Sequence, residues 1–212
     1  TPEELGRHAV TPAFRELTAA IAARVLPGAV YGPEPAAVNV RGAVGSSGIF
    51  NQRAEQCETL ATVTGAERPA GLVLAEIRLY KVREWNDPRY GTPTGRVGAV
   101  DVNRRKETDV FRGLFFAFDL GTAIRGTTFA DPKRVGSAIA ARDALEPVSF
   151  DDGDFENAFR VASSEPDEAR ALLTPSARAG LVRLRETTQR PVHLSFSEGR
   201  VSVAIEFGRP LF

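Results

Sequence analysis

Residues 109–119 read DVFRGLFFAFD, and this stretch decides the fold. Its apolar side chains fall on both alternating sets, with Phe111, Phe115 and Ala117 on one and Val110, Leu114, Phe116 and Phe118 on the other. This pattern is typical of a strand inside a sheet that is covered on two faces. Gly113 indicates a bulge or a close approach of another backbone. We therefore expect a β-strand at or near the centre of a sheet.

Further strand-like segments lie on both sides of this stretch. In one of them, Val73, Ala75 and Ile77 alternate with polar residues, which is the period of a strand. The dipeptide Glu198-Gly199 suits the tight turn of a hairpin. We expect strands at residues 57–64, 72–83, 123–130 and 145–150 and a closing β-hairpin formed by residues 191–197 and 200–207.

Helical patterns occupy the two ends of the chain. Thr11-Pro12 is typical of a helix start, and apolar residues then recur at spacings of three and four up to Pro27-Gly28. Residues 152–160 also have a helical pattern, and residues 164–167 resemble a capping box. Thr174-Pro175 predicts a longer helix that ends near residue 187.

The order of these elements predicts the fold class α+β. We expect an antiparallel β-sheet meander with an N-terminal helix, a C-terminal helical segment and a closing β-hairpin. The 212 residues, 42% of them hydrophobic, are enough for a single soluble domain over residues 1–212, with a possible sub-boundary near residues 131–147. Residues 84–108 contain Pro and Gly without a period, and we expect them to form a mobile loop.

Composition argues against several classes of function. The 27 basic and 27 acidic residues balance, so no nucleic-acid partner is expected. Cys57 is the only cysteine, and His8 and His193 are the only histidines, so we expect no metal site, no cofactor and no catalytic constellation. His193 alternates with apolar neighbours, which predicts a strand-surface or partly buried position.

Three segments carry a resemblance to a known family. Residues 155–161, FENAFRV, and residues 164–175, SEPDEARALLTP, together with FRGLFF at residues 111–116, resemble the bacterial family DUF3137. The similarity extends from roughly residue 14 to residue 205. The resemblance implies a membrane-associated protein of unassigned role, with hydrophobic segments upstream and a soluble portion that faces the cytoplasm at the inner membrane. The family has no agreed catalytic residues, so the resemblance assigns none to this chain.

Three residues are candidates for ligand binding. Arg112 lies within the most apolar strand and Arg170 follows Glu168, so each would either grip an anionic group or pair with a neighbouring carboxylate. Trp85 is the only tryptophan and could cover a pocket or close the end of a core.

Three classes of function remain open. The first is a binding or scaffolding module with a protein partner or self-association. The second is a small-ligand-binding protein or enzyme with a cleft near Trp85 and Arg112. The third is a peripheral module that contacts lipid through the first helix, although that helix lacks a basic polar face.

Overall fold

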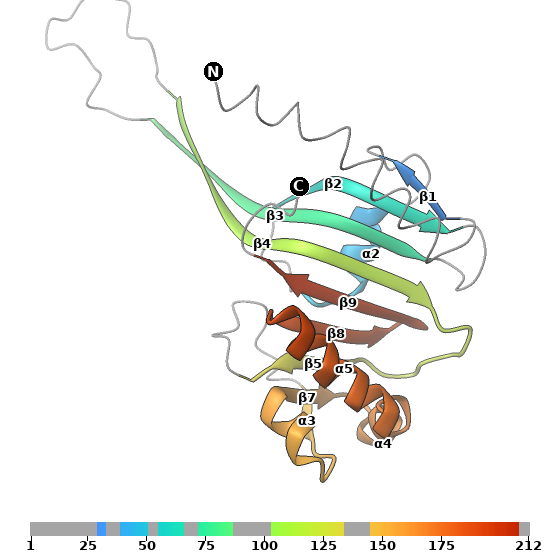
Figure 1. Cartoon of the computed structure of the whole chain (residues 1–212). Helices are drawn as coiled ribbons and strands as arrows, with labels where there is room; N and C mark the ends of the chain where they lie inside the picture. The colour runs from blue at the N-terminus through green and yellow to red at the C-terminus, as the bar shows by residue number, and fades with distance from the viewer. Residues whose placement is uncertain are drawn as a thin grey trace, which may run out of the picture.

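The computed structural model describes residues 29–32, 39–50, 55–65, 72–86, 103–133 and 145–207, and in these ranges the chain is mostly one open antiparallel sheet with a few helices (Figure 1). The strands are β1 (Ala29–Gly32), β2 (Gln56–Gly65), β3 (Val73–Asn86), β4 (Asn103–Asp119), β5 (Thr128–Pro132), β6 (Glu146–Val148), β7 (Phe159–Ser163), β8 (Val192–Ser197) and β9 (Arg200–Glu206). The helices are α2 (Val40–Ser46), α3 (Gly153–Ala158), α4 (Pro166–Leu172) and α5 (Pro175–Thr188). None of these helices has the length and apolarity needed to cross a bilayer.

The sheet has the strand order β1-β2-β3-β4-β9-β8-β5-β7-β6. The predicted meander therefore holds only from β1 to β4. The hairpin of β8 and β9 does not close an edge but lies inside the sheet, between β4 and β5. Its turn residues Glu198 and Gly199 have φ angles of 52° and 75°, and a two-residue turn of this hand matches the twist of the flanking strands.

The prediction for residues 123–130 was wrong. Residues 120–127 form no strand, and β5 begins only at Thr128. This strand pairs with β8 and β7 instead of returning along β4. The alternation of side chains predicts that a strand forms, but it does not predict which distant strand becomes its partner.

Strand β4 confirms the prediction of a central strand, since it pairs with β3 on one side and with β9 on the other. Only one of its two apolar sets is fully buried. Phe111, Phe115 and Ala117 are at most 1% exposed, whereas the set with Leu114, Phe116 and Phe118 is half-buried. The two sets point to opposite faces of the sheet, which we call the α2 face and the α5 face after the helices that cover them.

Val110 was assigned to the wrong set. The register shifts where Leu79 pairs with Phe111 and Tyr80 pairs with Asp109, which leaves Val110 as an extra residue in β4. Such a bulge turns the extra side chain toward the same side as its neighbour. Val110 accordingly packs beside Phe111 on the α2 face.

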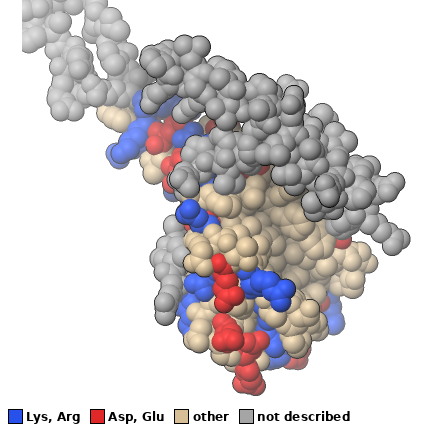
Figure 2. Space-filling model, viewed as in Figure 1, with Lys and Arg blue, Asp and Glu red and all other residues tan. Residues whose placement is uncertain are grey.

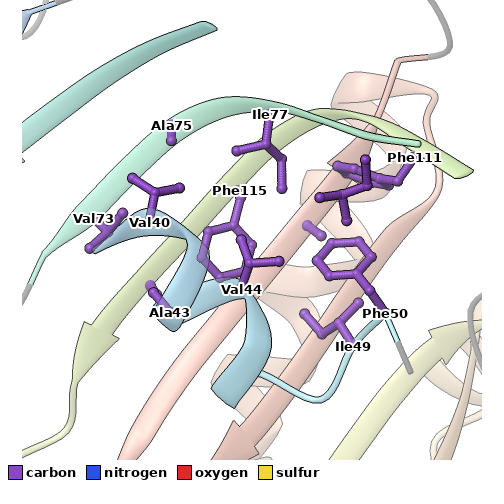
Figure 3. Packing of buried hydrophobic residues seen from close by; sticks show 13 residues of the cluster. Val40, Ala43, Val44, Ile49, Phe50, Val73, Ala75, Ile77, Phe111 and Phe115 are labelled. Atoms are coloured by element: carbon purple, nitrogen blue, oxygen red, sulfur yellow. The ribbon is translucent and has the colours of Figure 1, made fainter. Parts of the chain in front are cut away.

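A first core lies on the α2 face (Figure 3). Helix α2 begins at the N-cap Asn39, whose side chain accepts a hydrogen bond from the N–H of Gly42. The residues Val40, Ala43 and Val44 of this helix face the strands. This helix was not predicted, because its segment is rich in Gly and has no helical period. The other members of the core are Ile49, Phe50, Val73, Ala75, Ile77, Leu79, Phe111, Phe115, Ala117 and Ala204.

A second core lies on the α5 face, where α3, α4 and α5 cover the strands after β4 (Figure 1). The prediction for α5 is confirmed: Thr174 caps it by accepting a hydrogen bond from the N–H of Ala177, and Pro175 is its first residue. Leu181 of α5 packs in the same cluster as Val192 and Leu194 of β8. The two cores thus lie on opposite faces of one continuous sheet.

Between residues 152 and 167, the predicted helix is confirmed as α3 except for its last two residues, and the predicted capping box was wrong. The helical pattern ends at Ala158, and Phe159–Ser163 is strand β7, since four of its five residues are buried against the sheet. The capping box does not form, because Glu165, the N-cap of α4, makes no capping hydrogen bond through its side chain. The hydroxyl of Ser164 instead accepts a hydrogen bond from the N–H of Thr127.

Several predictions lie wholly or partly outside the described residues. The N-terminal helix at residues 11–27 and His8 are among them, as is most of the possible sub-boundary at 131–147. The proposed loop 84–108 begins and ends as strand, since β3 extends to Asn86 and β4 begins at Asn103. The residues between them are not described.

Glu168 of α4 joins this helix to the segment that follows β4, and replacing it should weaken the fold. Its carboxylate accepts hydrogen bonds from the backbone N–H of Arg125 at 3.1 Å and of Gly126 at 2.9 Å, and these bonds lower its pKa. Because the pKa of Glu168 is lower in the folded than in the unfolded chain, its charged form stabilises the fold at pH values above its unfolded pKa, near about 4.3. This stabilisation is lost as the pH falls through the folded pKa. We expect Glu168→Gln to lower the free energy of unfolding by about 1 kcal/mol at pH 7, after allowance for solvent exposure.

Urea unfolding at several pH values tests this expectation. The difference between wild type and Glu168→Gln should shrink as the pH falls below about 4. A difference that stays constant down to pH 3 would show that the charge of Glu168 is not the cause.

Candidate functional site

Strands β3 and β4 continue as a two-stranded arm beyond their neighbours in the sheet (Figure 1). The register runs from the pair Tyr80 and Asp109 to the pair Asn86 and Asn103. On one side of the arm, β2 pairs with β3 only as far as Tyr80. On the other side, β9 pairs with β4 only as far as Gly113. Within the described residues no strand flanks the arm, so its side chains contribute little to either core.

One face of the arm, which we call the paired face, carries a network of ion pairs. Arg78 at its base contacts Asp109 at 2.7 Å and Glu107 at 2.9 Å, and Arg105 contacts Glu107 at 3.0 Å. The hydrogen bond with Asp109 is the main reason why the pKa of Arg78 is raised above its ordinary value. The guanidinium of Arg78 also lies 4.5 Å from the centre of the Tyr80 ring. These four charged side chains therefore compensate one another.

The opposite face, which we call the basic face, has a different composition. Lys81, Arg83 and Trp85 of β3 alternate with the residues of the paired face, and Lys106 of β4 pairs directly with Arg83. All four side chains are exposed, Trp85 by 39%. Among the described residues, no carboxylate forms an ion pair with these three cations. Whether Trp85 covers a pocket or closes a core stays a prediction, since the residues that follow it along the chain lie outside the described ranges.

Arg112 lies on the α5 face of β4, opposite Arg78 of β3. Its Nε atom is 4.0 Å from a carboxylate oxygen of Glu76, whose side chain is fully buried while that of Arg112 is 20% exposed. A buried carboxylate is stable only when a cation and hydrogen bonds compensate for the loss of water. This arrangement agrees with an ion pair between Arg112 and Glu76.

The structure does not bring the three candidate residues together. Trp85 lies on the outer part of the arm and Arg112 lies on the opposite face of the hairpin, nearer the sheet centre. Arg170 is exposed on α4 and contacts Asp167, one helical turn earlier, at 2.8 Å. A surface groove of about 350 Å³ lies elsewhere, between α3 and α5, and its lining includes Asp154, Arg185 and Glu186.

A buried polar cluster on the α2 face was not predicted. His193 is fully buried, not at the surface or partly buried, and its Nδ1 atom is 2.9 Å from a carboxylate oxygen of Asp131. Its Nε2 atom and the hydroxyl of Ser195 have no hydrogen-bond partner within the described ranges. The register explains the burial, because His193 and Ser195 alternate with apolar residues in β8, a strand enclosed by β9 and β5. An Asp-His pair beside a serine can support acid-base chemistry, but these side chains are enclosed.

Other reactive groups are tied into the fold. Burial raises the pKa of the Cys57 thiol against a smaller opposing effect of Arg41, so the reactive thiolate is disfavoured. Asp152 accepts a hydrogen bond at the start of α3 and contacts Arg178 at 2.8 Å; the Arg178 bond is the main cause of its lowered pKa. In the part of the chain that the structure describes, no three His, Cys, Asp or Glu side chains are arranged to hold a metal ion.

An apolar strip lies on the α5 face, between the arm and the helical layer. Phe116 and Phe118 pack edge to face with their ring centres 5.4 Å apart, and Val203 is paired with Phe116 in the sheet. Figure 2 shows an extended area without charged side chains on this side of the molecule. The members of the strip, all half-buried, are Leu74, Leu114, Phe116, Phe118, Val203 and Ile205.

Comparison with known proteins gives one match. Residues 109–212 match the family described as "Protein of unknown function (DUF3137)", which confirms the resemblance. The match begins within β4, so it includes the C-terminal helices and the β8–β9 hairpin but not residues 14–108, where the resemblance was also expected. No curated protein and no solved structure matches the chain.

Proposed function

We propose, from the premise that residues 109–212 match DUF3137, that this chain is a binding or scaffolding module that acts through a protein partner or through self-association. The observation that carries this proposal is the apolar strip. Six apolar side chains on neighbouring strands stay half-buried, and three of them, Leu74, Leu114 and Phe116, belong to neither core, whereas α3, α4 and α5 cover the same sheet face further along. A contiguous apolar surface of this kind is typical of an interaction site.

The surroundings of the strip favour a protein partner with an apolar surface of its own. Its centre consists of Leu114 and Phe116, and Phe118 continues it toward the second core. The partly exposed side chain of Arg112, next to Leu114 on the same face, supplies a polar border on the side of the arm. An apolar centre with a polar rim is the usual anatomy of a protein interface.

The proposal places the module at the cytoplasmic side of the bacterial inner membrane. This part rests on the resemblance to DUF3137 alone. The alternative of a small-ligand-binding protein or enzyme receives less support, because Trp85 and Arg112 lie on opposite faces of the hairpin. The alternative of lipid contact through the first helix concerns residues outside the described ranges.

Site-specific photocrosslinking tests the proposed use of the strip. Benzoylphenylalanine in place of Phe116 should form a discrete adduct with another protein or with a second copy of the chain in the native host. The same residue in place of Arg183, an exposed position of α5, should not form this adduct. Sedimentation velocity of the purified chain then separates self-association from a different partner.

A variant checks that the adduct depends on the strip. Leu114→Ser should lower the yield of the adduct at position 116 by about tenfold, while circular dichroism shows that the sheet is kept. An adduct that forms equally well at position 183, or the lack of any adduct at position 116, would contradict the proposal.

A further inference from the structure

We infer that the basic face of the arm binds the surface of an anionic lipid bilayer. This surface is distinct from the apolar strip, because its residues Lys81, Arg83, Trp85 and Lys106 project from the other side of the β3–β4 hairpin. The inference therefore stands or fails independently of the proposed protein partner.

The arrangement of charge on the arm is the first argument. Arg83 and Lys106 are directly opposed cross-strand partners, and like charges at such positions destabilise a sheet. The next pair outward places Trp85 opposite Arg104, and the next pair inward places Lys81 opposite Thr108. The described carboxylate at the base of this face, that of Glu55, accepts a hydrogen bond from the N–H of Val82 instead of pairing with a cation. Cations that have no ion-pair partner among the described residues are explained if an anionic surface compensates their charge.

The separation of charge between the two faces favours a planar partner. Glu84, Glu107 and Asp109 all belong to the paired face. A β-ribbon that enters a nucleic-acid groove has phosphates on both sides, so the acidic side chains of the paired face would be repelled. A bilayer surface contacts the ribbon from one side only, where the charged residues of the β3–β4 pairs are all positive.

Trp85 adds a second kind of contact on the same face. An indole ring combines an apolar body with a polar N–H, and tryptophan is enriched where membranes meet water. Its exposure of 39% on the outer part of the arm leaves the ring free to enter the headgroup region. Basic residues beside an exposed aromatic residue are the usual composition of a surface that lies on anionic lipid.

Vesicle binding by the complete chain tests the inference. The chain should sediment with vesicles of phosphatidylcholine and phosphatidylglycerol but not with vesicles of phosphatidylcholine alone, and added salt should weaken the binding. Because Trp85 is the only tryptophan in the sequence, its fluorescence reports on this face specifically. We expect a blue shift of its emission on binding.

Two matched triple variants locate the contact. Lys81→Gln, Arg83→Gln and Lys106→Gln together should lower the partition onto anionic vesicles by about a hundredfold, since each cation near such a surface contributes roughly a fivefold gain. The control variant, Arg125→Gln, Arg160→Gln and Arg183→Gln, removes three exposed cations elsewhere and should bind nearly as well as wild type. Circular dichroism of both variants verifies that the fold is kept.

Three results would overturn the inference. The first is that the two triple variants bind anionic vesicles equally well. The second is that the chain binds without a change in Trp85 emission. The third is that the chain binds a DNA duplex or an acidic protein through the basic face and does not bind anionic vesicles.

Discussion

Replacement of Phe115 by Ala is expected to lower the free energy of unfolding by about 3–5 kcal/mol. Phe115 has no exposed surface and lies in the middle of the first core, with the Phe50 ring centre 6.3 Å from its own (Figure 3). It comes from a central strand held on both sides, so the backbone cannot move in to fill the cavity. Urea unfolding followed by circular dichroism measures the loss.

Phe116→Ala provides the matched control. The residue is the next one in the same strand, but its side chain is only half-buried on the α5 face. The expected loss is smaller, about 1–2 kcal/mol, because less apolar surface returns to water. A loss below about 1 kcal/mol for Phe115→Ala would contradict its position in the core.

Gly113→Ala is expected to cost about 3 kcal/mol or more and to leave little folded protein. A Cβ atom at this position would overlap the carbonyl oxygen of Ile205 in β9, and the carbonyl carbon of that residue would be 2.9 Å away. The obstacle is backbone, so no side-chain rotation relieves it and β4 must separate from β9. The sequence had indicated a bulge or a close approach at Gly113, and the close approach is what the structure shows.

Gly180→Ala distinguishes this steric effect from a general cost of replacing glycine. Gly180 lies within helix α5, and nothing lies within 4 Å of the position of its missing Cβ atom. Alanine there should stabilise the protein by roughly 0.5–1 kcal/mol. The melting temperatures of the two variants should therefore shift in opposite directions from that of wild type. A stable Gly113→Ala protein would show that β9 can move to accommodate the methyl group.

The sequence predicted the local structure of the C-terminal half better than the order of its strands. The alternation in residues 109–119 identified a central strand, and Thr174-Pro175 identified the start of α5, because both signals depend on neighbours in the sequence. The insertion of β8 and β9 between β4 and β5 depends on contacts between distant segments. The periodicity of apolar residues along the sequence does not reveal such contacts. The burial of His193 could not be predicted for the same reason.

The basic face had a signal in the sequence that was overlooked. Lys81, Arg83 and Trp85 alternate with Val82 and Glu84, which is the period of a strand with two chemically different faces. The composition of the segment from residue 84 onward, rich in Pro and Gly, favoured a loop and hid this alternation. Lys106 could be placed beside Arg83 only once the register was known. The overall charge balance concealed the face as well, because the paired face supplies the compensating acids.

The interior position of the β8–β9 hairpin has a consequence for biosynthesis. Ribosomes deliver these two strands after all the other described strands of the sheet, so the facing edge of β5 has no partner until β8 has emerged, and that of β4 has none until β9 has emerged. The nascent chain must hold two unfinished half-sheets, and exposed strand edges recruit other chains. Completion then requires pairing between residues far apart in the sequence, which slows folding. Pairing of β9 with β4 and of β8 with β5, not the formation of either core, therefore sets the moment at which the two half-sheets become one.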